Sequence, residues 1–298
     1  MNANVPKNHH FIPQHFLKAW CFSGKKLVRY KRRKKIGDIE VQKASIVSVA
    51  SQPNLYRVEF PDGGFEIETS HVSPHVDAGG YTILEQARQQ DVSWLSAAQR
   101  RALANYVVFL EARHPEVIKT MDVKSLLPEL AAQAKREGLT SESVDHVIQY
   151  FDSAESLGEM AFGLFINNEL SGLLAKPFAD GLLQAELREY RFSSDILACS
   201  SYPVFRVGDY TKSSILLVLS ITPCKALVYS SNHSLLNGLP ENVRAAYFNL
   251  CALAKAEEVY FVDETMKDFV EKHLGWTKEK NEKETQVYLL DFINSLYS

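Results

Sequence analysis

The sequence has few cysteines and no long apolar run, and each of these absences argues against a class of protein. Its four cysteines, at positions 21, 199, 224 and 251, form no C-x-x-C pair and no zinc-ribbon spacing. We therefore expect single, mostly buried thiols instead of disulfides or a metal cage. The longest apolar stretch, around 215–221, is far shorter than the roughly 20 residues of a membrane helix, and the first residues lack the apolar centre of a signal peptide. These absences predict a cytoplasmic protein that does not enter a membrane.

Motifs for nucleotides and for serine nucleophiles are also missing. Gly63-Gly64 and Gly79-Gly80 lack the strand-to-helix context and the Lys-Ser/Thr ending of a phosphate-binding loop. We expect no nucleotide cofactor. No G-x-S-x-G pattern surrounds Ser200 and Ser201, so a turn held by Pro203 is the favoured role of that segment.

What the chain does contain suits one large globular body. Its 298 residues are 46% hydrophobic and 23% charged, with no internal repeat or low-complexity linker. We interpret residues 1–298 as a single domain. Three sub-regions follow one another in it: a basic β-rich lobe at 1–69, a helical region at 70–190 and an α/β region at 191–298.

The apolar spacing predicts an α+β fold with a small β-rich N-terminal lobe, a central helical bundle and a C-terminal mixed sheet with terminal helices. The clearest helix spans 97–113, because Ser96 and Gln99 form a capping box before it. The other predicted helices cover 14–22, 76–90, 123–136, 141–153, 155–167, 242–256, 264–274 and 287–297. The predicted strands cover 27–30, 36–41, 55–60, 65–68, 196–199, 204–207, 215–218, 226–229 and 259–262.

Acidic residues are absent from the first 37 positions. That segment holds ten of the 33 Lys and Arg residues and none of the 36 Asp and Glu residues. Such a run is typical of sites that neutralise phosphates, and it predicts nucleic-acid contact. Two alternatives stay open: a basic edge strand that resists aggregation, and pairing with the acidic remainder of the chain. Eight of the ten cations lie within eleven positions: Lys25, Lys26, Arg29, Lys31, Arg32, Arg33, Lys34 and Lys35.

The sharpest local motif is Asn8-His9-His10-Phe11-Ile12-Pro13-Gln14. Two adjacent histidines followed by a proline resemble the first strand of ββα-metal (HNH or AHH) nucleases, in which one histidine ligates a divalent metal and the next activates water. That resemblance implies a Mg²⁺ or Zn²⁺ ion. Residues 16–50 contain neither His nor Asn, so the third element of such a site would have to be His15, His71 or His75.

Over nearly its whole length the chain resembles the uncharacterised, mainly bacterial family of domain of unknown function 4238. HHFIPQHFLKAW is similar to the opening pattern of that family, KKLVRYKR to its following strand, and the helix that ends in Arg113-His114-Pro115 to its long helix closing in Arg-x-Pro. The later blocks around Ser200-Ser201-Tyr202-Pro203 and Phe248-Asn249 match more weakly. The resemblance brings no established activity with it.

Further candidate site residues are implied by the resemblance to this family, and two more are suggested by their spacing. The family pattern holds an arginine at Arg113, where it would clamp a phosphate or form a buried ion pair. Glu68 and Asp77 are carboxylates that would join His9 as metal ligands or orient His10. His71 and His75 share metal-ligand spacing, but Pro74 between them favours a polar loop.

Two functions of different classes remain at this stage. The first is a metal-dependent phosphodiesterase or nuclease, in a bacterial defence or toxin-like role. There His10 is the general base, His9 a metal ligand or orienting group, and Arg113 a clamp for transition-state charge, with Asn8 and Gln14 as supporting hydrogen-bonding groups. The alternative is a non-catalytic module that binds nucleic acid or protein, in which the His-His-x-x-Pro segment is structural.

Overall fold

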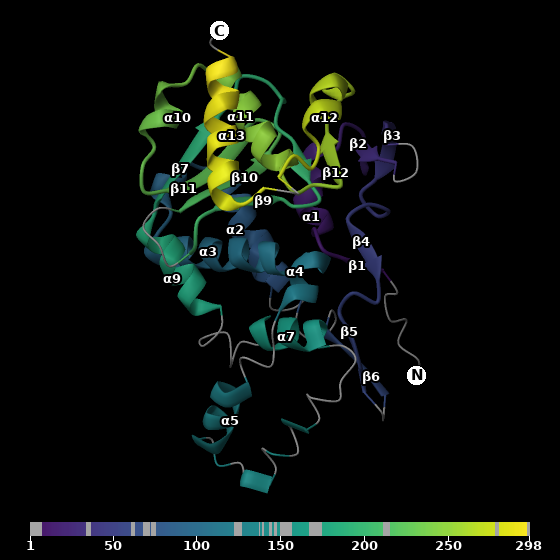
Figure 1. The fold of residues 1–298 in the computed structure, drawn as a ribbon, viewed down its shortest axis with the longest axis vertical. Helices are drawn as coiled ribbons and strands as arrows, with labels where there is room; N and C mark the ends of the chain where they lie inside the picture. The colour runs from purple at the N-terminus through teal and green to yellow at the C-terminus, as the bar shows by residue number, and fades with distance from the viewer. Residues whose placement is uncertain are drawn as a thin grey trace.

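The α+β fold expected from the sequence is confirmed in the computed structural model (Figure 1). It describes residues 8–33, 37–60, 63–67, 72, 76–121, 127–136, 138, 140–142, 145, 148–149, 157–166, 175–210, 215–277 and 280–296. Strands lie in the N-terminal part and again from residue 186 to residue 261, most of the described residues between these two groups are helical, and two helices end the chain.

The first sheet joins the two ends of the chain. Its strands lie in the order β3-β2-β12-β8, all antiparallel, with bounds β3 Ile39–Ser45, β2 Lys26–Arg32, β12 Glu258–Phe261 and β8 Cys199–Ser200. Lys31 lies opposite Glu258 in this register, and Tyr30 lies opposite Val259. The predicted basic strand is therefore an interior strand, and β3 is the edge of the sheet.

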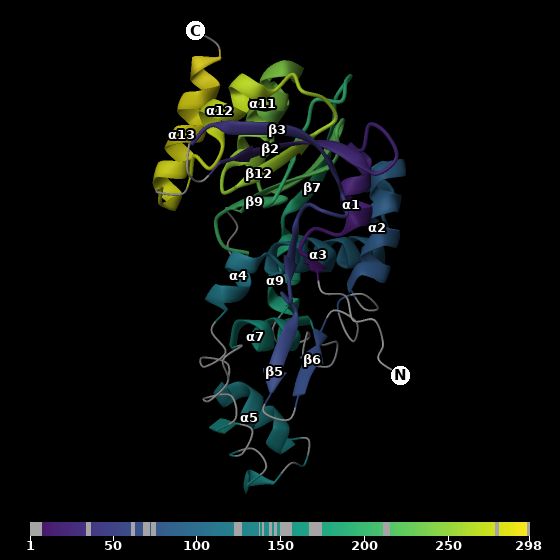
Figure 2. The same ribbon diagram turned by 90° about the vertical axis from the view of Figure 1, so that its right-hand side faces the viewer.

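The second sheet is built from residues 186–230, so its first strand lies in the range that was predicted as the helical region. Its order is β7-β11-β10-β9, also antiparallel, with bounds β7 Glu186–Arg191, β11 Lys225–Ser230, β10 Leu216–Thr222 and β9 Val204–Val207. Helix α11 (Glu241–Leu253) packs on this sheet and helix α13 (Glu282–Ser295) packs on α11. The remaining C-terminal helices are α10 (Ser234–Gly238) and α12 (Lys267–His273). Figure 2 shows α11, α12 and α13 together on one side of the strands.

The short N-terminal elements are two small ribbons and one helical turn. Strand β1 (Asn8–His10) pairs with β4 (Ser51–Pro53), and β5 (Arg57–Phe60) pairs with β6 (Gly63–Glu66). Helix α1 (Gln14–Leu17) continues as a 3₁₀ turn, η1 (Lys18–Trp20). The Trp20 indole donates to the carbonyl of Leu197 at 2.8 Å, and this bond ties the N-terminal segment to the C-terminal third.

The central helices lie below the two sheets in the views of Figures 1 and 2. Helix α3 (Ala97–Ala112) carries the predicted capping box of Ser96 and Gln99, and it packs against α2 and α9. The bounds of the other elements are α2 Ala78–Gln89, η3 Val92–Trp94, α4 Pro115–Thr120, α5 Leu127–Arg136, α7 Leu157–Ile166 and α9 Lys176–Gln184. Of the predicted helix at 141–153, only residues 141, 142, 145, 148 and 149 are described, and each is helical.

The largest hydrophobic core joins α1, α2, α3, β2 and the second sheet, with Phe16, Trp20 and Leu103 completely buried. Burial of apolar surface on this scale is the main stabilising contribution to such a fold. All four cysteines are free, as predicted, and Cys199 and Cys251 are buried. Within the described residues, no helix has the length and apolar character needed to cross a bilayer.

One predicted strand is mostly wrong. The range 196–199 was expected to be extended and paired, but β8 begins only at Cys199. Asn249 explains the difference, because its side chain accepts from the Ala198 amide at 2.8 Å and donates to the Ile196 carbonyl at 2.9 Å. A buried amide side chain thus satisfies backbone groups that a neighbouring strand would otherwise bind.

Candidate functional site

The segment with the two histidines is held on both sides by backbone contacts. Strand β1 pairs with β4, so that His9 lies opposite Gln52, and the Phe11 amide donates to the Ala50 carbonyl at 2.9 Å. Ile12 and Pro13 are buried, and α1 begins at the next residue. The proline suits this place because it has no amide hydrogen and its backbone already has the conformation that precedes a helix.

His9 is packed as a core residue. Only 1% of it is exposed, and its ring lies parallel to that of Tyr56 with the centroids 5.5 Å apart. Its Nδ1 accepts a hydrogen bond from the Tyr56 amide at 2.8 Å. That lone pair is therefore used within the fold and is not available to a metal ion.

His10 is half-buried and differently placed. Its Nε2 lies 3.2 Å from the carbonyl oxygen of Val47, which can only accept, so Nε2 carries the proton and Nδ1 carries the lone pair. Burial lowers the pKa of His10 below the usual 6.5, although hydrogen bonds to the Val47 and Ile46 backbone oppose the shift. The neutral ring is the form that can accept a proton.

Arg113 connects the His-pair strand to the end of α3. It is 1% exposed, and each part of its guanidinium donates: Nη2 to the His10 carbonyl at 2.7 Å, Nε to the Tyr56 hydroxyl at 3.2 Å and Nη1 to Asp77 Oδ1 at 2.5 Å. The Tyr56 hydroxyl in turn lies 3.1 Å from the Arg113 carbonyl. Of the two uses of this arginine considered from the sequence, the contacts favour the buried ion pair.

Three of the sequence-predicted site residues thus come together around one guanidinium. His10 contributes its backbone carbonyl, Asp77 its carboxylate and Arg113 the cation. His15 lies near them; its Nε2 is 3.2 Å from the Tyr106 hydroxyl, and burial lowers the pKa of this histidine to about 4. This set of residues, together with Tyr56, is called the Arg113 cluster below.

The predicted metal ligands are only partly described. Glu68, His71 and His75 lie outside the described residues. His9 and Asp77 are described, and both are engaged by the contacts given above. Within the residues that the structure describes, no three His, Cys, Asp or Glu side chains are close enough to hold a metal ion together. The metal site therefore stays a prediction.

The basic strand divides into paired and unpaired cations. Lys25 and Lys26 are exposed and have no carboxylate partner among the described residues. Arg33 pairs with Asp38. Arg32 donates to the carbonyls of Gly37 at 2.8 Å and Glu271 at 3.3 Å, which gives it a structural role as well. Lys34 and Lys35 lie outside the described residues.

Arg29 and Lys31 both approach one buried carboxylate. Arg29 Nη1 is 3.7 Å and Lys31 Nζ is 3.3 Å from Glu258 Oε2. The other oxygen of Glu258 accepts from the Tyr260 hydroxyl and from the Ala50 amide. Two cations thus share one negative charge.

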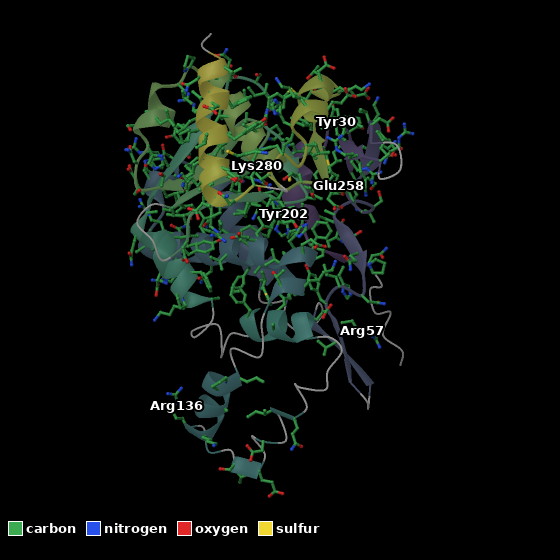
Figure 3. The ribbon with its side chains drawn as sticks, in the orientation of Figure 1. Tyr30, Arg57, Arg136, Tyr202, Glu258 and Lys280 are labelled. Atoms are coloured by element: carbon green, nitrogen blue, oxygen red, sulfur yellow. The ribbon has the colours of Figure 1, made fainter. Side chains whose placement is uncertain are left out.

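A cavity of about 290 Å³ opens beside these cations. It lies between β2, β4, β12 and the start of α4, and Figure 3 labels Glu258 and Tyr202 in this part of the molecule. Arg29, Lys31 and Phe11 line it, whereas His9, His10, Asp77 and Arg113 do not. The structure therefore separates the predicted nucleic-acid residues from the predicted catalytic ones. We call this space the β2 pocket.

His114 also lines the β2 pocket, and its role was missed from the sequence. It is 7% exposed, and its ring stacks on Tyr202 with the centroids 3.5 Å apart. Its Nδ1 accepts from the Glu116 amide at 3.1 Å, which caps α4. Burial lowers the pKa of His114 to about 3, so the ring is neutral.

A model of the family described as protein of unknown function (DUF4238) matches residues 8–289. The chain belongs to this family. Searches of the curated proteins and of the solved structures find no match. In this DUF4238 chain the matched range includes both the Arg113 cluster and the β2 pocket.

Two residues of these sites, Tyr56 and Glu258, could not be predicted from the sequence of the DUF4238 chain, because no motif or spacing marks them. Tyr56 contacts His9, His10 and Arg113, but it stands in NLYRV without any spacing that relates it to them. Glu258 follows Glu257 in a stretch that indicates only a strand. The contacts of Tyr56 with these residues and of Glu258 with Lys31 span 46 or more positions along the chain, which no local pattern encodes.

Proposed function

We propose that this DUF4238 protein is a nucleic-acid-binding module whose contact surface is strand β2 with the β2 pocket. In this proposal the His-His-x-x-Pro segment is structural. It corresponds to the second of the two functions that the sequence left open, with nucleic acid as the partner.

The observation that carries the proposal is the position of β2 inside its sheet. An edge strand gains from lysines because they discourage pairing with another chain, but β2 already has strands on both sides. Protection of an edge therefore does not explain its cations. Lys25, in the turn just before β2, and Lys26, its first residue, remain without a carboxylate partner in the described part of the chain, and unpaired surface cations are the groups that bind phosphates.

The contacts of His9 and Arg113 support the structural role of the histidine segment. Both side chains are 1% exposed, and the donors and acceptors described above are directed at backbone groups, Tyr56 and Asp77. A phosphate clamp would need guanidinium donors that face the ligand.

Replacing Lys25 and Lys26 together by Ser should flatten the salt dependence of nucleic-acid binding. Each phosphate contact contributes about 0.9 to the slope of log K against log salt for duplex DNA and about 0.7 for single strands. We expect the slope to fall by about 1.5 when binding is measured by fluorescence anisotropy at several salt concentrations. K25S/K26S also spares the fold, because neither lysine makes an ion pair among the described residues.

The matched control is K176S/K283S, which removes two exposed lysines from α9 and α13. It has the same effect on net charge and should leave the slope within about 0.3 of the wild type. Equal slopes for both double variants, or no binding by the wild type at low salt, would contradict the proposed function.

A second candidate, metal-dependent phosphodiester cleavage, is favoured by one observation at His10. The Val47 carbonyl fixes the proton on Nε2 and burial lowers the pKa of the ring, so Nδ1 carries a lone pair of defined orientation on a residue whose backbone carbonyl accepts from Arg113. A general base needs these properties. In this role His10 would activate water, and the predicted ligands His9, Glu68 and Asp77 would have to rearrange around a divalent ion.

The substitution His10→Ala tests the second candidate. As a general base, His10 can be removed with a change of less than about 1 kcal/mol in the free energy of unfolding, because its side chain is only half-buried. Turnover of a nucleic-acid substrate with Mg²⁺, Mn²⁺ or Zn²⁺ should then be lost. Absence of metal-dependent turnover in the wild type, or loss of turnover only in proportion to unfolded protein, would reject this candidate.

A further inference from the structure

The β2 pocket is lined by three kinds of group that point to a specific kind of ligand. Arg29 and Lys31 are its cations, and the exposed residues Glu116 and Glu257 are acceptors. Phe11, Pro53 and Pro115 supply apolar surface. A ligand that fits would carry an anionic group, a flat or apolar part and a hydrogen-bond donor.

The cationic end has donors that the fold leaves unused. Lys31 Nζ has three hydrogens and contacts only Glu258 Oε2 among the described residues. With the amide oxygen of Gln42 turned toward Arg29, Nε and Nη2 of the arginine donate to it, while Nη1 makes no hydrogen bond in the described part of the structure.

Glu258 holds these two cations in place without neutralising both. Its Oε2 is buried and accepts no hydrogen bond, and its Oε1 is anchored by Tyr260 and Ala50. The carboxylate thus fixes two positive groups at the pocket and leaves one excess positive charge within this group of three, while Glu116 and Glu257 also line the pocket. A phosphate diester carries one negative charge, which matches that excess.

His114 adds a second, independent indication of a polar ligand. With Nδ1 occupied by the Glu116 amide, the neutral ring carries its proton on Nε2. This N–H has no acceptor among the described residues, although the side chain is more than nine-tenths buried and lines the pocket. Nε2 is not among the buried polar atoms that lack a partner, so it is open to the pocket, where a bound group can be its acceptor.

We propose that the β2 pocket takes one unpaired nucleotide of a single-stranded nucleic acid. Its phosphate binds Arg29 and Lys31, its base lies against Phe11, and an amino group of the base donates to Glu257. This inference rests on the proposed function and narrows it from nucleic acid to single strands. A base within a duplex cannot enter such a pocket, because its edge is paired and its faces are stacked.

The first test compares a labelled 12-nucleotide single strand with the blunt duplex of the same sequence at one salt concentration. We expect the single strand to bind at least tenfold more tightly. Lys31→Gln should weaken single-strand binding by about tenfold and reduce that preference, because it removes a charge-assisted contact. The side chain of Lys31 is 41% exposed, and Arg29 remains beside Glu258 in the variant.

The matched control is Lys43→Gln. Lys43 lies on the neighbouring strand opposite Val28, so its side chain is on the other face of the sheet from Arg29 and Lys31. Its removal should leave the preference for single strands unchanged. Equal effects of Lys31→Gln and Lys43→Gln, or equal binding of single strand and duplex, would overturn the inference.

A second variant, Glu257→Gln, tests whether the pocket recognises the base of the nucleotide. Cytosine has an exocyclic amino group and thymine has none, so the wild type should bind a dC oligomer several-fold more tightly than a dT oligomer. Glu257→Gln, at an exposed position, should remove that difference. Inorganic phosphate that competes as well as deoxycytidine monophosphate would show a site for phosphate alone and would overturn the nucleotide assignment.

These outcomes are separate from those of the proposed function. If Lys25 and Lys26 set the salt dependence while Lys31→Gln behaves like its control, nucleic-acid binding stands and the pocket assignment fails. If the wild type binds no nucleic acid at low salt, both fail.

Discussion

Replacing Arg113 by Met should lower the free energy of unfolding by about 3 kcal/mol. Removal of one partner from a buried ion pair typically costs about 3–5 kcal/mol, because the remaining charge and its hydrogen-bonding groups stay buried. We expect a loss at the lower end of this range, because the Asp77 side chain is 20% exposed and water can reach it. The His10 carbonyl and the Tyr56 hydroxyl also lose their donor. Urea denaturation followed by fluorescence and circular dichroism measures this change.

Arg101→Met provides the comparison. Arg101 also pairs with an aspartate, Asp180, but both side chains are more than one-third exposed. Exposed pairs contribute about 0–1 kcal/mol, so this variant should unfold almost like the wild type. Similar losses for Arg113→Met and Arg101→Met would mean that the Arg113 cluster does not stabilise the fold. A stable Arg113→Met protein that had lost turnover would instead favour the catalytic role of the arginine.

Mild acid should destabilise the protein strongly. Burial lowers the pKa of His15 and His273 to about 4 and that of His114 to about 3, all below the unfolded value of 6.5. As the pH falls below 6.5 the unfolded chain binds protons that the folded chain does not, so stability is lost until the folded pKa values are reached. Each histidine contributes up to about 1.4 kcal/mol per pH unit. With a reduction for partial exposure, we expect a loss of about 4 kcal/mol between pH 7 and pH 5.

His114→Asn isolates one of these contributions. Asparagine accepts from a helix amide as well as histidine does, so α4 keeps its cap, but it does not titrate. The variant should lose about 1.5 kcal/mol less than the wild type between pH 7 and pH 5, as measured by urea denaturation at each pH. An unchanged pH dependence would mean that His114 is protonated in the folded protein.

The sequence correctly predicted those helices and strands that are determined by interactions between residues close together in the chain. The capping box at Ser96 and Gln99 sets the start of α3, and both hydrogen bonds are present in the structure. The apolar runs at 204–207 and 226–229 became β9 and most of β11. The Glu186–Arg191 strand was missed because four of its six residues are charged, and its place in the sheet comes from pairing with β11.

The candidate sites show the same difference between motifs that are visible in a short stretch of sequence and contacts between residues far apart in the chain. The motif around His9 and His10 could be noticed in the sequence, and so could the run of cations in β2. Their partners could not, because Tyr56, Asp77 and Glu258 reach them across the fold. Burial also decides the chemistry: His9 and His10 are adjacent, yet one is enclosed and the other is half-exposed.

The pairing of β2 with β12 has a consequence for the order in which the chain is made. The partner strand of residues 26–32, at 258–261, is synthesised more than 220 residues after them. Until then β2 is a sheet edge with unpaired backbone groups, and Arg29 and Lys31 have no Glu258 to hold them. Closing such a distant contact is slow, and open edges invite pairing with other chains. The first sheet can therefore close only after the chain has been synthesised through Phe261, so association of nascent chains competes with folding until then.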